Sequence, residues 1–301
     1  MANYNFKQEA KVYLVFSGTT ILLDVEPDIN FSQTFTDKTY PQKTLHEQHK
    51  LHDASNIKKA NPANFDFTIP AIDETDFNIL YQQLVDFKTG TNTLNTFDLY
   101  IVFTNGTTYK IETCVITNGT FIIEKLENLR LTIAGQGAKL ITSGVSVPST
   151  PSRGTRTPLQ IKHLLVKIAS ITLSASVFKV SVELQNNITW NPYETVNNAL
   201  SVTNAATSMY PSQFTLQKRI LSGSVEQYIT SDFNSDLQQW ETGVTVDIQA
   251  GTSATKGFQF DIENCTFTNR LSVDEAFKQT YDWKMNENPT DLGTIIKINN
   301  V

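Results

Sequence analysis

The sequence has few cysteines, few charged residues and no long apolar run. Only 2 of its 301 residues are cysteines, too few for a disulfide framework, so we expect both to be small buried hydrophobes in a reducing compartment. No segment has the length and apolarity of a membrane span, and the first residues lack the basic and apolar regions of a signal peptide. Lys and Arg (24) are outnumbered by Asp and Glu (30), for a net charge of −6. This balance disfavours ordinary nucleic-acid binding, because gripping phosphates requires a basic surface.

Catalytic and metal-binding motifs are also missing. A zinc protease needs His-Glu-x-x-His, but His46 and His49 are one residue too close. We favour a solvated or partner-contacting loop there, with a metal site at His46, His49 and His52 as the alternative. Gly135 and Gly137 form only a fragment of a phosphate-binding pattern and predict a turn. There is no nucleophile elbow and no Cys/His pairing at catalytic spacing. We therefore expect no enzyme, no cofactor and no metal.

One segment of the sequence occurs twice. Residues 109–118 (YKIETCVITN) match residues 260–269 (FDIENCTFTN), and the two cysteines, Cys114 and Cys265, fall at the same point of the match, 151 residues apart. A duplicated domain of about 150 residues has the usual size for a single core. Pro and Gly cluster between the copies. The sequence thus predicts a first domain at 1–145, a linker at 146–158 and a second domain at 159–301.

Each predicted half contains mostly β-strands. Strands are expected at 12–16, 20–25, 65–69, 97–103, 109–117, 120–124 and 129–134, then as a long strand pair over 164–184, and at 244–249, 258–268 and 277–285. Asn-Gly dipeptides at Asn105 and Asn118 predict tight turns.

One helix is expected in each half. The first follows Asp73 or Thr75 and ends near Gly90. Its apolar face comprises Phe77, Leu80, Tyr81 and Leu84. The second helix is expected at 224–240. The predicted class is mainly β (α+β): two tandem β-barrel or sandwich modules, each with one flanking helix.

This order of elements resembles the tail tube proteins of long-tailed bacteriophages and the tubes of contractile injection systems. The resemblance covers residues 12–298 and rests on element order and duplication. It implies an inner β-barrel with the helix outside and six modules per ring. Two modules per chain imply trimeric, pseudo-sixfold rings that stack into a conduit for DNA ejection.

The resemblance also implies partners, a location and roles for particular residues. The partners would be further copies of the chain, a tape-measure protein, and baseplate and tail terminator proteins; the tail would be assembled in the host cytoplasm. Loops at 36–62 and 191–210 would contact neighbouring rings. The expected ring-stacking residues are Tyr40, Leu45, His46, His49, His52, Lys58, Tyr193 and Glu194.

One charged strand face has two interpretations. Lys110 and Glu112 share a face of one strand, and Asp261 and Glu263 occupy the matching face in the second copy. They would line either the lumen, where carboxylates repel DNA phosphates, or a solvent-exposed sheet face.

Three alternative functions are kept. The first is a baseplate or tail-tip ring that initiates the tube. The second is a β-rich adhesin or carbohydrate-binding protein that uses Trp190, Tyr193 and Tyr210, and the third is an enzyme that acts on polysaccharide.

Overall fold

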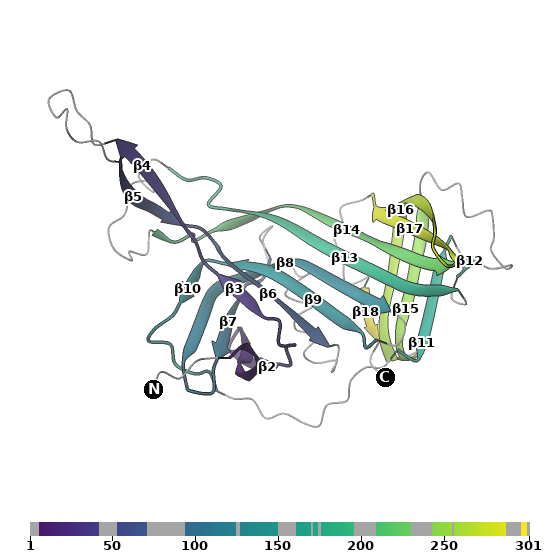
Figure 1. Cartoon of the computed structure of the whole chain (residues 1–301), viewed down its shortest axis with the longest axis horizontal. Coiled ribbons are helices and arrows are strands. Elements are labelled where there is room, and N and C mark those ends of the chain that lie inside the picture. Colours follow the sequence, from purple (N-terminus) through teal and green to yellow (C-terminus); the bar gives the residue numbers. More distant parts are fainter. Residues whose placement is uncertain are drawn as a thin grey trace.

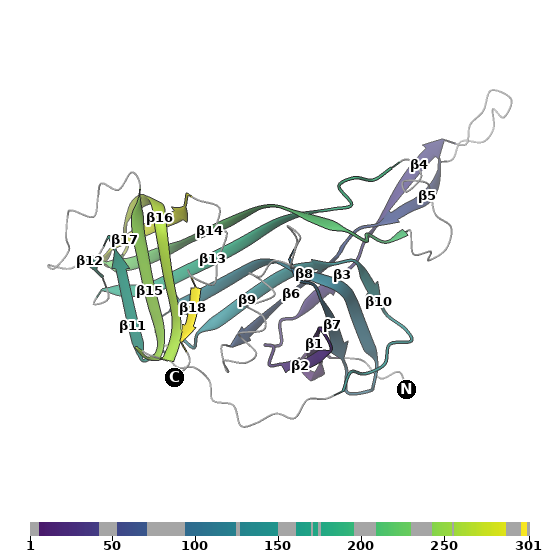
Figure 2. The same ribbon diagram turned by 180° about the vertical axis from the view of Figure 1, so that it is seen from behind.

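The computed structural model is built almost entirely of antiparallel β-strands (Figures 1 and 2). It describes residues 6–41, 53–70, 94–124, 127–149, 161–169, 171–173, 176–195, 209–229, 243–254, 256–286 and 296–299. Helical structure among these residues is limited to the 3₁₀ turn η1 (Lys7–Glu9) and the 3₁₀ conformation of Met209. No helix in this part of the chain is long and apolar enough to span a membrane. The mainly β class predicted from the sequence is confirmed.

Strands of the N-terminal part precede residue 142. They are β1 (Lys11–Phe16), β2 (Thr19–Leu23), β3 (Asn30–Ser32), β4 (Phe35–Pro41), β5 (Asp53–Ala60), β6 (Ala63–Pro70), β7 (Phe97–Val102), β8 (Thr108–Glu124), β9 (Arg130–Gly137) and β10 (Lys139–Ile141). Apolar and polar residues alternate along these strands. In β6, Ala63, Phe65 and Phe67 are buried while Asn64 and Asp66 are exposed, as in a sheet with one face on the core and one in solvent.

Strands of the C-terminal part follow residue 162. They are β11 (His163–Ile168), β12 (Ile171–Thr172), β13 (Val177–Trp190), β14 (Phe214–Tyr228), β15 (Val244–Ser253), β16 (Lys256–Val273), β17 (Phe277–Met285) and β18 (Ile296–Asn299). Figure 1 shows β13 and β14 as a long ribbon that extends from this part toward the β4–β5 hairpin, which projects from the body.

The two parts share one order of strand pairing. In the N-terminal part, neighbouring strands follow β2-β1-β7-β8-β9-β6-β3, and in the C-terminal part they follow β12-β11-β15-β16-β17-β14-β13. β13 also pairs with β8, which joins both runs into one 16-stranded sheet. A single hydrophobic cluster runs through both parts.

The repeated cysteines occupy the same local structure. Each follows a residue in the left-handed region, Thr113 at φ 54° and Asn264 at φ 55°, where the register with the preceding strand shifts. Cys114 and Cys265 are both free and fully buried, as the sequence predicted. Burial raises the pKa of both thiols, to about 12 for Cys265. Each thiol contacts the carbonyl oxygen three residues earlier, at 3.3 Å and 3.8 Å.

Several local predictions are wrong. Residues 224–228, expected to begin a helix, continue β14 because they pair with β13 and β17 on both sides. The rest of that segment, 230–242, and the first predicted helix with Phe77, Leu80, Tyr81 and Leu84 lie outside the described residues.

Two predicted turns are instead parts of strands. Asn118 and its neighbour Gly119 lie inside β8, held by β9 and β13, whereas Asn105 does lie in a turn. Gly135 and Gly137 lie in β9, where close packing excludes a side chain. A Cβ at Gly135 would lie 2.2 Å from Cζ of Phe65.

Candidate assembly surface

The junction between β8 and β13 shows how the two parts are held together. The pairs run from Asn118 opposite Gln185 to Glu124 opposite Lys179. On its other edge, the same stretch of β8 pairs with β9. This half of β8 is therefore hydrogen-bonded on both edges.

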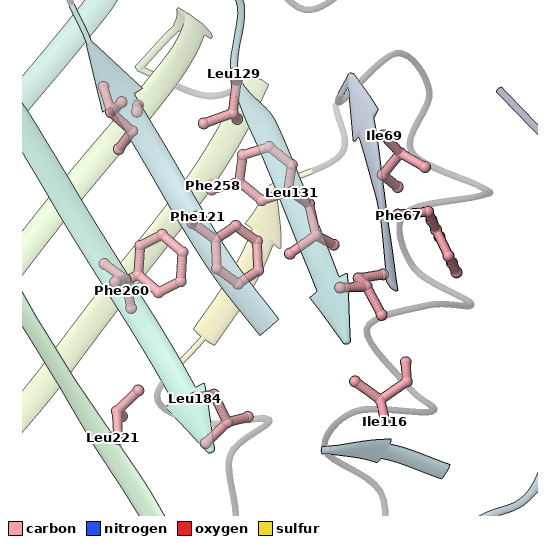
Figure 3. Close-up of a cluster of buried hydrophobic side chains, with 14 of the residues drawn as sticks. Phe67, Ile69, Ile116, Phe121, Leu129, Leu131, Leu184, Leu221, Phe258 and Phe260 are labelled. Atoms are coloured by element: carbon pink, nitrogen blue, oxygen red, sulfur yellow. The ribbon is translucent and has the colours of Figure 1, made fainter. Parts of the chain in front are cut away.

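Phe121 is the centre of the packing at this junction. Its ring is 1 % exposed and lies 5.1 Å from the Phe260 ring and 6.1 Å from the Phe258 ring, measured between centroids. Figure 3 shows Phe121 between these β16 side chains and Leu131 of β9. Ile123 and Leu129 are buried to a similar degree, at 2 % and 1 % exposure. A buried aromatic cluster of this kind makes a dry, well-ordered contact.

Polar contacts extend the junction along the β13–β14 ribbon. The Asn118 amide donates to the Glu183 carboxylate at 3.1 Å, and the Asn186 amide donates to the carbonyl of Ile116 at 3.1 Å. Trp190 donates from its indole N–H to Gln136 at 3.0 Å. These bonds fix the ribbon against the N-terminal part.

The second half of β16 lacks such a cover. Residues 265–273 pair with β17 on one edge, whereas β15 pairs with β16 only as far as Cys265. Within the described part of the chain, the opposite edge of 266–273 has no partner strand. Leu271 and Val273, both 65 % exposed, lie on this stretch, and Phe277, 57 % exposed, lies opposite Val273 on β17. Two large apolar side chains on an unpaired edge, with a third on the adjacent strand, are a typical protein-binding surface.

A second open edge lies on β3. This strand pairs with β6, with Phe31 opposite Phe65, and no other described strand pairs with it. Ile29 beside it is 3 % exposed, and Phe31 is half-buried against Tyr109, with ring centroids 5.7 Å apart. The outer edge of β3 thus borders an apolar cluster.

Charged side chains gather where the sequence predicted a lumen face. Lys110 Nζ lies 2.9 Å from Asp98 Oδ2 and 3.0 Å from Glu112 Oε1. Burial alone would lower the pKa of Lys110, but the hydrogen bonds and charges of Asp98 and Glu112 raise it above its ordinary value. Lys110 and Glu112 flank buried Ile111 on one strand face.

The two matching positions of β16 are both occupied by carboxylates. Asp261 is half-buried and Glu263 exposed, and Ile262 between them is buried. The shared faces are as predicted; whether they line a lumen stays a prediction.

The expected ring-stacking residues fall in two places. Tyr40 and Lys58 belong to the β4–β5 hairpin, so the segment expected to be irregular is a strand pair in its described portions. Tyr193 is 85 % exposed, and Glu194 forms an ion pair with Lys59 of the hairpin. Leu45, His46, His49 and His52 lie outside the described residues. Their stacking role stays a prediction.

The other candidate sites were a metal site and a sugar site lined by aromatic residues. The described residues contain no group of three or more possible metal ligands. Trp190 packs on Phe214 at 5.4 Å, and Lys139 lies over the Tyr210 ring at 4.6 Å. Of the aromatics considered for a sugar site, only Tyr193 is fully exposed.

The sequence reasoning missed Leu271, Val273 and Phe277. A signal was present: Phe267, Leu271 and Val273 continue a period-two pattern beyond residue 268, where the predicted strand ended. Nothing in the sequence could say that this half of the strand lacks a neighbour.

Comparison with known proteins gives a family for the whole chain. No curated protein matches it. The model of the Bacteriophage Baseplate Tube Protein Family matches residues 2–298. A strand-rich structure with unpaired sheet edges suits a subunit of such a tube. With nearly its whole length matched, the chain belongs to the bacteriophage baseplate tube protein family.

Proposed function

We propose that this structural protein of the phage virion forms a ring of three copies around a channel for DNA. Each copy would supply two tandem modules, 1–145 and 159–301, so that six modules surround the channel. The family supports a place in the baseplate portion of the tube, where a ring of this kind would start or continue the conduit.

The observation that carries this proposal is the internal β8–β13 junction together with the open edges of β16 and β3. One run of strands is joined to the other inside the chain, and among the described strands β16 and β3 each keep an unpaired edge, as do the end strands β12 and β2. Two different, complementary edges produce head-to-tail contacts, and such contacts close into rings when the rotation allows it. Closure also removes exposed strand edges, which are an aggregation hazard in a free monomer.

The charge balance supports passage of DNA rather than binding. A net charge of −6 and the carboxylates Glu112, Asp261 and Glu263 would keep phosphates from sticking to the channel wall. We place Lys110, Glu112, Asp261 and Glu263 at the lumen. Lys110 is already neutralised by two carboxylates, so it would add little attraction.

Contacts along the tube axis would use the β4–β5 hairpin and the loop after β13. The hairpin projects from the body (Figure 2). Tyr193 is exposed and directly precedes Glu194, which forms an ion pair with Lys59 of the hairpin. Copies in adjacent rings, a tape-measure protein inside the growing tube, and other baseplate or terminator proteins are the proposed partners. No catalytic step is part of this role.

Sedimentation and negative-stain microscopy of the purified protein test the proposal. We expect rings with a central hole and a mass of three chains of 33.8 kDa. Isolated rings would favour a single baseplate ring, and hollow filaments a repeated tube. A protein that stays monomeric at high concentration, or rings of another stoichiometry, would refute the trimer.

A further inference from the structure

We propose that the second half of β16 pairs antiparallel with β3 of the next copy, with Leu271 opposite Phe31 of that copy. This inference rests on the proposed ring and specifies the contact that closes it. The partner is therefore a second copy of this chain, bound through one defined register.

The register follows from one row of residues that both parts share. In the N-terminal part, Phe31, Phe65, Gly135 and Ile116 lie opposite one another across β3, β6, β9 and β8. In the C-terminal part the row is Val182, Gly223, Trp283 and Phe267 across β13, β14, β17 and β16.

Both rows are anchored to the repeated cysteines. Ile116 is two residues after Cys114, and Phe267 is two residues after Cys265. Phe31 therefore holds the place on β3 that Val182 holds on β13.

The other half of the match is on β8 and β16. Phe121 lies opposite Leu131, four residues before Gly135 on β9, and Leu271 lies opposite Gln279, four residues before Trp283 on β17. β8 reaches this place with one extra residue because of a bulge between Ile116 and Asn118. Leu271 therefore holds the place of Phe121.

Transferring the internal junction gives the contact between copies. Inside the chain, Phe121 lies opposite Val182 and Ile123 opposite Val180. The transferred pairs are Leu271 with Phe31, Val273 with Ile29, Arg270 with Ser32, and Ser272 with Asn30.

Exposure supports the transfer independently. The places of Leu271, Val273 and Phe277 are those of Phe121, Ile123 and Leu129, which are at most 2 % exposed in the internal junction. Their counterparts, two on the open stretch of β16 and one on β17, are 57–65 % exposed. The same three places are thus buried where β13 is present and exposed where no described strand covers the edge.

An apolar site for Leu271 exists on the N-terminal part. Phe121 rests on Phe260, and the residue matching Phe260 in the repeat is Tyr109. Tyr109 and Phe31 are both half-buried and in contact with each other. Leu271 of the preceding copy would pack on this pair.

Charges set a limit on the strength of the contact. The internal Glu124–Lys179 pair, at 3.9 Å, becomes Asp274 facing Asp28 of the next copy. Lys278 Nζ lies 3.2 Å from Asp274 and offsets part of this repulsion. The contact should therefore be held by the apolar pairs and strengthen with added salt.

Cysteine pairs test the register. Arg270→Cys with Ser32→Cys places two thiols directly opposite on the exposed face. Mild oxidation should then give covalent dimers and closed trimers, with no larger species, because cross-strand partners lie within disulfide reach. The control Arg270→Cys with Asn30→Cys is displaced by two residues and should crosslink at least tenfold more slowly. Cys114 and Cys265 are buried and stay reduced in both.

Microscopy of the same samples separates the two proposals. Rings that crosslink through Asn30→Cys rather than Ser32→Cys, or through neither, would overturn the register and leave the ring standing. If the unsubstituted protein formed no rings, the proposed ring itself would be wrong.

A charge on the edge gives a second measurement. Leu271→Asp should abolish ring formation while the monomer folds normally, because the side chain is already exposed. Val147→Asp is the matched control, since Val147 is 50 % exposed and belongs to neither β16 nor β3. Rings that survive Leu271→Asp would contradict the proposal.

Discussion

β8 and β16 run through the same place in their two runs of strands, yet only β8 is covered on both edges along its second half. The cover is β13, which belongs to the same chain. Phe121 is consequently 1 % exposed and Leu271 65 % exposed. The difference lies in the available neighbour rather than in the strands themselves. The exposed apolar side chains of β16 therefore lie where β8 has a neighbour from its own chain.

The sharpest way to test this comparison is to remove the matched side chains. Phe121→Ala should lower the free energy of unfolding by about 3–5 kcal/mol, because it leaves a cavity in the junction. Leu271→Ala should change the stability of the dilute monomer by less than about 0.5 kcal/mol and weaken ring formation instead. Urea denaturation at low concentration measures the first effect and sedimentation the second. If both variants lost the same amount of monomer stability, Leu271 would already be part of the monomer's packing, and the contrast between the covered edge of β8 and the open edge of β16 would be wrong.

The shared row of residues offers a second test. Phe65 faces Gly135 in one part, while Gly223 faces Trp283 in the other, so the aromatic ring and the glycine exchange strands. A Cβ at Gly223 would lie 2.1 Å from the Ser181 carbonyl oxygen and 2.5 Å from Cζ2 of Trp283. Gly223→Ala and Gly135→Ala should each cost about 1–3 kcal/mol of unfolding free energy through overpacking.

Gly106→Ala is the control for this pair. Its Cβ would meet nothing within 4 Å, although φ is +85°. We expect the smaller penalty of a side chain in a left-handed turn, about 1 kcal/mol. If the two strand glycines tolerate alanine better than Gly106 does, the close packing of the row does not govern stability.

The smallest expected effect concerns the charges on the two matched faces. Lys110→Met should lower the free energy of unfolding by about 1 kcal/mol at pH 7, because Asp98 and Glu112 lose a partly buried cation. The folded-state pKa of Lys110 is raised, so its contribution is complete below the ordinary value of 10.5 and is lost as pH rises through the folded value.

Unfolding titrations of the wild type and the variant should therefore differ by a constant amount from pH 7 to 9 and converge at higher pH. Asp261→Asn, at the matching place on β16, should change stability by less than about 0.5 kcal/mol. A difference between wild type and Lys110→Met that grows with pH would contradict the assigned sign.

Local patterns in the sequence predicted much of the sheet but not its connections. The alternation in β6 and the repeated segment around Cys114 and Cys265 identified strands that the structure contains. Residues 224–228 misled because helical spacing of a few aromatics is also compatible with a strand, and pairing on both edges decides the outcome. Asn118 misled for the same reason, since β9 and β13 override its turn preference.

The candidate assembly surface was harder to predict than the strands. Arg270, Leu271 and Val273 have an ordinary strand sequence. On β8 the matching residues are covered by β13, which lies far along the chain, whereas no described strand covers this edge of β16. Charge patterns placed Lys110 and Glu112 on one face correctly, because a period of two is a local property. No local pattern specifies which edge of a strand stays open.

The internal β8–β13 junction has a consequence for the kinetics of building the proposed ring. Three of the six module-to-module contacts, one within each chain, would form as the chains fold, and their formation would not depend on protein concentration. A ring would then assemble from three molecules rather than from six single-module proteins. Its formation would depend less steeply on protein concentration, so that rings could form from scarce subunits. A linear dimer would already hold four of the six modules in sequence, and the arrival of a single further molecule would complete the circle.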